Sequence, residues 1–90
     1  MPANIKIESM DERRFRVTVT GDGSKSSHVV TLESEYYQKL TSGKIGAEEL
    51  IRRSFEFLLE REPKESILTT FELPVIGRYF PEYEAAMKRL

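Results

Sequence analysis

The chain has 90 residues, of which 39% are hydrophobic and 32% are charged, and its formal net charge is −1. This length and composition suit one soluble globular domain and argue against wholesale disorder. The small net charge excludes a global field that would attract nucleic acid or an anionic membrane. The absence of cysteine excludes disulfides and thiolate chemistry. We expect a single domain over residues 1–90.

The amino-terminal end and the apolar runs bear on where the protein resides. Residues 1–6 lack the apolar core of a secretion signal. No apolar run approaches the roughly 20 residues that are needed to cross a bilayer. We expect a cytoplasmic protein without a membrane partner.

The first third of the chain is strand-like. Apolar and polar residues alternate over 4–8, 14–20 and 28–33, which is the period of a half-buried strand. Gly21–Ser26 has the composition of a turn and predicts a hairpin whose loop is longer than two residues. Met10–Arg13 joins the first alternating run to the second. The pattern predicts a three-stranded antiparallel β-meander with one apolar face.

The middle of the chain is helical. A short helix is expected over residues 34–40, with Ser34 as its N-cap and Gly43 at its end. A longer helix opens at Gly46 and runs through about Glu62, since Pro63 disfavours helical geometry in the residue before it.

The apolar arc of the longer helix is wide. Placing residues 100° apart gathers one stripe from Ala47, Leu50, Ile51, Ser54, Phe55 and Leu58. Phe57 and Leu59 flank this stripe on opposite sides and extend the arc to roughly half of the circumference or more. A sheet covers only one side of a helix, so something else must cover Phe57 or Leu59.

The last third concentrates aromatic residues, with four of the nine between Phe71 and Tyr83. Exposed rings would forgo burial worth roughly 1.5–3 kcal/mol each. The segment must therefore dock on its own domain, on a second copy or on a partner. Residues 66–71 resemble a capped turn, and Pro74 and Pro81 suit the first positions of two short helices, with a bend at Phe80.

Together these elements predict an α+β fold, in which a three-stranded antiparallel β-meander is followed by several α-helices that pack against it. The candidate interface residues are the apolar side chains that this arrangement leaves in need of a cover. They are Phe57, Leu59, Phe71, Tyr79, Phe80 and Tyr83.

The second half of the chain resembles the pattern of a family of small bacterial proteins of about this length. The resemblance lies in Phe71-Glu72-Leu73, Ile76 and Tyr79-Phe80-Pro81-Glu82-Tyr83, preceded by Ser54–Leu59 and Glu62–Leu68. It implies a shared single domain over nearly the whole chain. It implies no chemistry, because that family carries no assigned function, and no functional residue is transferred from it.

Few residues offer catalytic chemistry. His28 is the only histidine, and no nucleophile or carboxylate is placed beside it by more than sequence proximity. We expect an exposed or edge-strand histidine there. Gly21 to Lys25 joins two strands and does not open a helix, so it is a hairpin and not a phosphate-binding loop. We expect no enzyme activity, no cofactor and no metal.

Besides an enzyme that uses His28, which is the weakest of the three hypotheses, two functions remain from the sequence. The first is a non-catalytic interaction or assembly domain, which associates with itself through an uncovered sheet edge or an apolar residue of the long helix, or binds an unidentified protein partner. The alternative is a DNA-binding regulator or antitoxin-like protein of ribbon-helix-helix type, suggested by the order of His28–Glu33, a short helix and Gly46–Leu58. The alternate residues of that strand are not those that read base edges, so nucleic acid is the weaker expectation.

Overall fold

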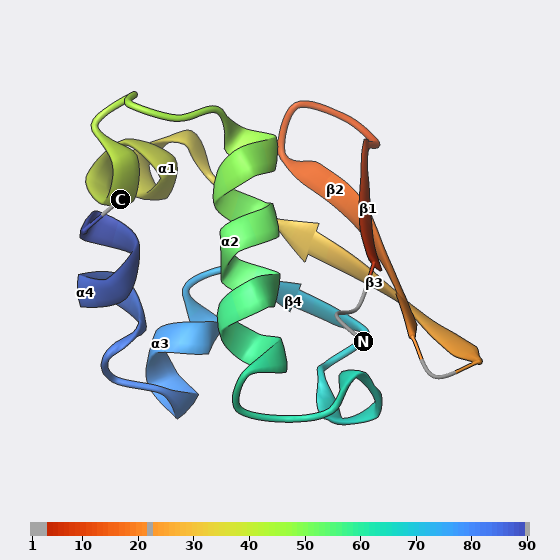
Figure 1. Ribbon diagram of the computed structural model, residues 1–90. Helices are drawn as coiled ribbons and strands as arrows, with labels where there is room; N and C mark the ends of the chain where they lie inside the picture. The colour runs from red at the N-terminus through yellow and green to blue at the C-terminus, as the bar shows by residue number, and fades with distance from the viewer. Residues whose placement is uncertain (1–3, 22, 90) are drawn as a thin grey trace.

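A four-stranded sheet in the order β1-β2-β3-β4 carries the fold. The computed structural model describes residues 4–21 and 23–89 (Figure 1). Strands β1 (Asn4–Ser9), β2 (Arg14–Gly21) and β3 (Ser24–Thr31) are antiparallel neighbours. The meander expected from the alternating pattern is therefore present, as part of a larger sheet.

The turn between β1 and β2 is organised by Asp11. Its carboxylate accepts hydrogen bonds from the backbone N–H groups of Arg13 and Arg14, at 2.9 and 2.8 Å, and from Nε of Arg14 at 2.7 Å. These bonds to the ionised form, led by the Arg13 amide, lower the pKa of Asp11 from 3.8 to about 2. A short acidic side chain that caps its own turn explains why the connection needs so few residues.

The β2–β3 hairpin is tighter than the sequence suggested. Gly21 pairs with Ser24, which leaves only positions 22 and 23 between the strands, and residue 22 lies outside the described residues. Gly23 has a φ of 75°, a left-handed conformation that favours glycine. The longer loop expected over residues 21–26 is therefore wrong. Strand pairing uses backbone hydrogen bonds, so the polar residues Ser24–Ser27 can form part of β3.

A fourth strand was missed by sequence analysis. β4 (Thr70–Glu72) lies parallel to β3, with Val30 opposite Phe71. The N–H of Val29 donates to the carbonyl of Thr69 at 2.7 Å, and that of Leu73 to the carbonyl of Thr31 at 2.9 Å. The capped turn expected over 66–71 is therefore wrong. A 3₁₀ turn, η1 (Lys64–Ser66), comes first, and the chain is then extended.

The helices match the expected positions but not all the expected ends. They are α1 (Ser34–Thr41), α2 (Ala47–Leu59), α3 (Val75–Tyr79) and α4 (Tyr83–Lys88). Glu33, and not Ser34, is the N-cap of α1. At the carboxyl-terminal end of α1, Ser42 and Gly43 have positive φ angles. α2 stops at Leu59, since a tight turn returns the N–H of Glu62 to the carbonyl of Leu58 before Pro63. The expected bend is present at Phe80, which is extended between α3 and α4.

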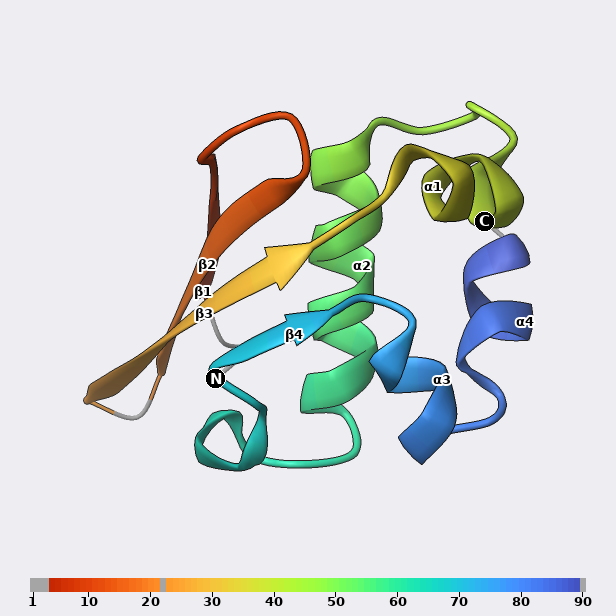
Figure 2. The same cartoon turned by 180° about the vertical axis from the view of Figure 1, so that it is seen from behind.

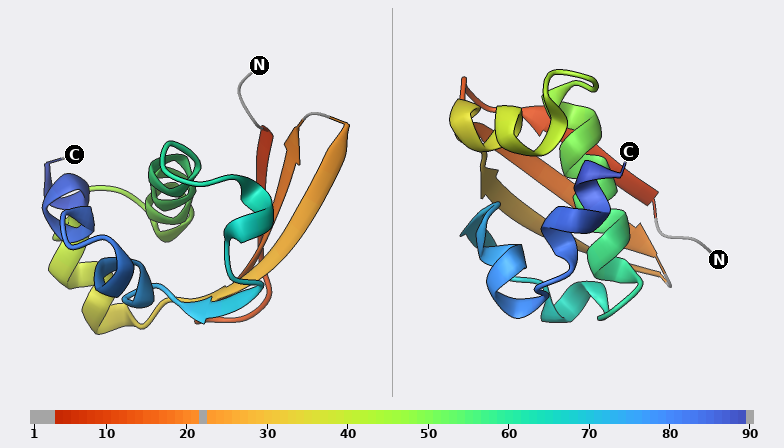
Figure 3. Two further views of the ribbon diagram at one scale, coloured as in Figure 1. Left: turned by 90° about the horizontal axis from the view of Figure 1, so that it is seen from below. Right: turned by 90° about the vertical axis from the view of Figure 1, so that its left-hand side faces the viewer.

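α2 lies between the sheet and the remaining helices. Figure 1 shows it in the centre, with the strands on one side and α1, α3 and α4 on the other, and Figure 2 shows the same order from behind. The left view of Figure 3 shows that the helices occupy one face of the sheet. α2 accordingly buries residues around much of its surface: Leu50, Ile51, Ser54, Phe55, Phe57 and Leu58.

The carboxyl-terminal helix is tied to α1 and to α2. Glu84 accepts a hydrogen bond from the Tyr36 hydroxyl at 2.8 Å and forms an ion pair with Lys39 at 3.3 Å. The Tyr36 bond is the main cause that lowers the pKa of Glu84. The Tyr83 hydroxyl lies 2.6 Å from Oγ of Ser54 inside the core, and burial raises the pKa of that hydroxyl. α4 thus closes the second side of α2.

Candidate interaction groove

An apolar groove opens where the carboxyl-terminal end of α2, residues 66–68, β4 and α3 meet. Its volume is about 240 Å³. All of its lining residues except Glu62 and Ser66 are apolar or aromatic, and the full lining is Leu58, Glu62, Ser66, Ile67, Leu68, Phe71, Val75, Ile76, Tyr79 and Phe80. We refer to these residues as the groove.

The groove has a buried floor and an exposed rim. Leu58, Ile67 and Ile76 are each 5% exposed or less and form part of the protein's core. On the rim, Leu68 is 46% exposed and Tyr79 is 67% exposed. Among the described residues, the only other large apolar side chain with such exposure is Met10. Exposed apolar side chains that gather at a hollow mark an interaction site more often than scattered ones do.

Short elements with sharp corners position the α3 side of the groove. The N–H of Leu73 donates to Thr31 at the end of β3, which anchors the chain before Pro74. The N–H of Gly77 then donates to the carbonyl of Pro74 at 3.0 Å and starts α3. The helical spacing of Val75, Ile76 and Tyr79 places them on one face of this short helix. That face lines the groove.

His28 holds the opposite side of the groove in place. Its Nδ1 donates to the carbonyl of Leu68 at 2.7 Å, and its Nε2 is bonded to the hydroxyl of Ser26 at 2.7 Å. The ring is 1% exposed and lies 5.4 Å from the ring of Phe55. The expectation of an exposed or edge-strand histidine is therefore wrong, because residues 67–69 run alongside β3 and cover it. His28 is a positioning residue for the Leu68 backbone.

Replacing His28 by alanine should lower the free energy of unfolding by about 2–4 kcal/mol, because the change leaves a cavity in place of the buried ring and removes the donor to the Leu68 carbonyl. The amide of Val29, which donates to Thr69, should exchange its hydrogen faster than in the wild type. Urea unfolding and amide hydrogen exchange measure these two effects.

Ser26→Ala serves as the matched control for His28, since it removes one hydrogen bond and keeps the ring. It should cost only about 0.5–1.5 kcal/mol. Equal stability of His28→Ala and the wild type would contradict the role of this histidine in holding residues 67–69.

The structure divides the six candidate interface residues by exposure. Three are buried in the protein's own core: Phe57, Phe71 and Tyr83. Two are half-buried, namely Leu59 and Phe80, and Tyr79 is mostly exposed. The carboxyl-terminal segment covers Phe57, whose ring meets Phe80 at 5.9 Å and Tyr83 at 5.4 Å in edge-to-face contacts. Phe57 and Tyr83 are thus held within the core and absent from the groove.

Three of those six residues do come together in the groove: Phe71, Tyr79 and Phe80. The other lining residues, among them Leu68, Val75 and Ile76, were not candidate interface residues in the sequence analysis. The available signal was the apolar content of residues 67–76, which exceeds what a short solvated turn would carry. Their convergence required β4, which sequence analysis did not predict.

Arg61 covers the ring of Phe57 on the side of the turn before α4. The guanidinium carbon of Arg61 lies 3.5 Å from the centre of the Phe57 ring, and its Nε bonds Glu82 at 3.2 Å. The backbone amide of Glu82 and then Arg61 lower the pKa of that carboxyl. Arg61 therefore links α2 to the turn before α4 and shields Phe57 from solvent.

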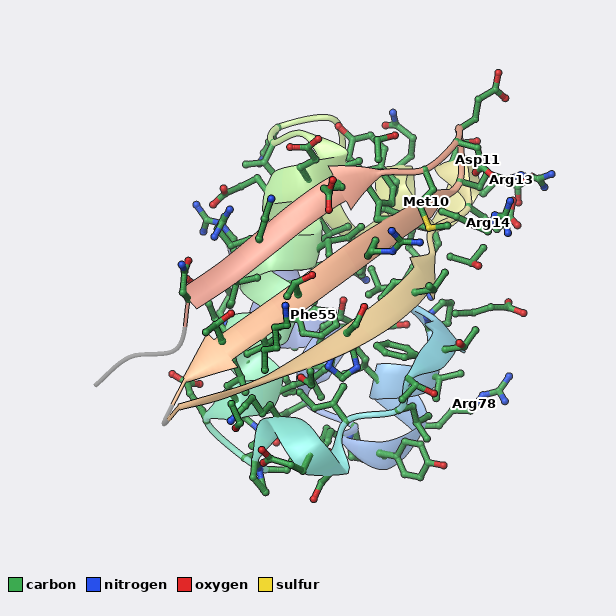
Figure 4. The ribbon with its side chains drawn as sticks, turned by 90° about the vertical axis from the view of Figure 1, so that its right-hand side faces the viewer. Met10, Asp11, Arg13, Arg14, Phe55 and Arg78 are labelled. Carbon is green, nitrogen blue, oxygen red and sulfur yellow. The ribbon has the colours of Figure 1, made fainter. Side chains whose placement is uncertain are left out.

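The other face of the sheet is polar and open. Figure 4 shows it without helices in front, with Met10, Arg13 and Arg14 gathered at the β1–β2 turn and Phe55 behind the strands. The register places Glu8 opposite Arg16, so opposite charges are neighbours there. None of the outward side chains of the described strands is aromatic, which leaves this face without a platform for stacking bases.

The strand edges differ in how they are covered. β3 has β2 on one side, and β4 together with η1 on the other, where Ser24 donates to Glu65 at 3.4 Å. Lys64 of η1 also donates to the carbonyl of Gly21, at the end of β2, at 3.0 Å. β1 is an edge strand, and Nη1 of Arg52 donates to its Ile5 carbonyl at 2.9 Å. The sheet therefore ends in β1 on one side, where Arg52 of α2 occupies part of the edge, and in the short strand β4 on the other.

Residues 4–21 and 23–89 include no group of three or more His, Cys, Asp or Glu side chains that could hold a metal ion. Over the same ranges no helix is long and apolar enough to cross a membrane.

Comparison with known proteins adds no assignment. The chain matches no family model, no curated protein and no solved structure. The resemblance to a family of small bacterial proteins therefore stays a prediction, and the groove is the basis for the function proposed below.

Proposed function

We propose that this protein is a non-catalytic, cytoplasmic interaction domain that binds a protein surface through the groove. The observation that carries the proposal is the exposure of Leu68 and Tyr79 at the rim of an apolar hollow. Burial of these two side chains against a partner would recover roughly 1.5–3 kcal/mol for each that becomes fully covered. A protein surface supplies the apolar contacts that such a rim needs.

The chemistry of the groove supports binding over catalysis. Glu62 and Tyr79 are its titratable lining residues, and Ser66 supplies the one aliphatic hydroxyl. The lining residues include no histidine, cysteine or lysine that would activate this hydroxyl. His28 lies behind the groove wall with both ring nitrogens engaged. An enzyme that uses His28 would need access to a ring that is 1% exposed.

The ribbon-helix-helix alternative ranks lower. It requires a strand that pairs with its counterpart across a dimer and enters the major groove. The strand in question is β3, whose edges are occupied by β2 on one side and by β4 and η1 on the other. Of its outward residues, only Lys25 beside the hairpin is a long basic side chain, and Ser27, Val29 and Thr31 are not the residue types that read bases.

Site-specific photo-cross-linking in the native cell tests the proposed function. A benzophenone amino acid at Ser66, an exposed lining residue of the groove, should give covalent adducts with protein. The same amino acid at Ser27, an exposed serine on the open sheet face, is the matched control and should give far fewer. Gel electrophoresis and mass spectrometry identify the adducts. Equal or absent adduct formation at the two positions would overturn the proposal.

A further inference from the structure

We infer that the occupant of the groove is a second copy of this chain. In the two-fold arrangement, Tyr79 of each copy rests in the groove of the other, and Arg78 of each copy faces Glu62 of the other. This inference rests on the proposed function, which it deepens by naming the partner.

The size of the groove favours a side chain over a free ligand. Its volume of about 240 Å³ lies below the roughly 300–1,000 Å³ of pockets that enclose small molecules and cofactors. An apolar floor with few polar groups offers little to orient a small polar compound. A single aromatic ring presented by a protein surface fits both the size and the lining.

The protein itself presents such a ring at the right place. Tyr79 is the most exposed of the large apolar side chains in the described residues, and it stands on the groove's own rim. A two-fold contact is self-complementary when one patch holds both a hollow and a projecting group. Tyrosine and arginine are also the residue types that most often dominate the energetics of interfaces.

The charges around the groove are complementary under the same symmetry. Glu62 follows α2 and is the only acidic lining residue, while Arg78 belongs to α3, which forms the other side. Helical spacing puts Arg78 beside Val75 at the rim, and Figure 4 shows its side chain extending away from the body of the protein. Among residues 4–21 and 23–89, neither Glu62 nor Arg78 has an ion-pair partner.

A two-fold axis through the groove exchanges its two sides, which brings each Arg78 over the partner's Glu62. The arrangement therefore forms two equivalent ion pairs around two buried tyrosine rings. About ten lining residues a side is fewer than the roughly 20–30 of a standard interface, so the dimer should be weak, with a Kd in the micromolar range or above.

Sedimentation velocity over a range of concentrations tests the inference on the full chain. The wild type should show a reversible monomer–dimer equilibrium. Tyr79→Ala, Arg78→Glu and Glu62→Arg should each raise Kd at least about tenfold, because they remove the anchor or create two like-charge contacts per dimer. Arg16→Glu on the open sheet face is the charge-matched control and should leave Kd unchanged. Circular dichroism checks that each variant remains folded.

The decisive sample is an equimolar mixture of Arg78→Glu and Glu62→Arg. In the two-fold arrangement their heterodimer regains both ion pairs, one native and one with the charges exchanged, so association should return to near the wild-type level. A partner other than a second copy cannot produce this rescue. Lack of rescue in the mixture, or an unchanged Kd for Tyr79→Ala, would overturn the inference.

The outcomes also separate this inference from the proposed function. A wild type that stays monomeric up to about 1 mM, together with Ser66 adducts to other proteins, would leave the interaction domain in place and remove the second copy as its occupant. A monomeric wild type without Ser66 adducts above the Ser27 control would remove both.

Discussion

Deleting residues 64–90 should abolish cooperative folding. The deleted segment supplies six core side chains, namely Ile67, Phe71, Leu73, Ile76, Tyr83 and Met87. At roughly 1.5–3 kcal/mol each, their burial contributes about 9–18 kcal/mol. A domain of this size has a total stability of only about 5–13 kcal/mol. The loss is therefore comparable to the whole stability or larger, and the deletion also exposes Phe57 and the β3 edge.

Thermal unfolding followed by circular dichroism measures this effect, with the full-length chain under the same conditions as the reference. The full-length chain should show a sigmoidal transition, and the chain that ends at Pro63 should show none. A truncated protein with a sharp transition and well-dispersed amide resonances would contradict the packing role of the carboxyl-terminal segment.

The second large effect distinguishes two tyrosines four positions apart. Tyr83→Ala should lower the free energy of unfolding by about 3–5 kcal/mol, because the ring is 0% exposed and packs against Phe57. Tyr79→Ala is the matched control, and it should change stability by less than about 0.5 kcal/mol in the monomer, since its ring is mostly in solvent. Urea unfolding at low protein concentration measures both.

Tyr83→Phe separates the ring from the hydroxyl. This variant keeps the ring and loses only the bond to Ser54, whose hydroxyl still donates to the Leu50 carbonyl at 2.8 Å. It should therefore cost only about 0.5–1.5 kcal/mol. Equal costs for Tyr79→Ala and Tyr83→Ala would refute the division of the aromatic segment into core and rim.

Local patterns predicted the elements that carry their own signal. The three antiparallel strands follow from a period of two, and Met10–Arg13 is the connection that remains between the first two alternating runs. α2 follows from a period of 3.6, and its wide apolar arc correctly required a second cover for Phe57. The prolines located the breaks around α3 and α4, since their effect on the preceding residue is steric and local.

Patterns failed where the deciding contact lies far away in the sequence. Thr70–Glu72 is too short to display a period, and it becomes a strand only because β3 offers an edge at Val29–Thr31. His28 shares a face with Val30, yet its burial depends on residues 67–69 running alongside it. The groove likewise depends on a contact between distant segments, because the pairing of β4 with β3 fixes the position at which α3 begins.

Part of the candidate site could therefore be predicted from the sequence, namely the aromatic segment that supplies it. The need to place the carboxyl-terminal rings against something was evident from their number, and Phe71, Tyr79 and Phe80 do line the groove. Which rings are buried and which remain exposed was not evident, because Tyr79 and Tyr83 are the same residue type in similar sequence surroundings. Their difference arises from the direction in which Phe80 turns the chain.

The amino-acid sequence by itself determined that this protein is an α+β chain whose amino-terminal meander is covered by helices, because backbone periodicity and turn chemistry act over a few residues. Only the tertiary structure decided that a parallel fourth strand forms and that His28 is enclosed. The tertiary structure also decided that Leu68 and Tyr79 remain exposed at the rim of the groove. These features depend on which segments, distant in the sequence, pack against α2 and β3. Local sequence patterns do not determine this packing, because it depends on contacts across the whole chain.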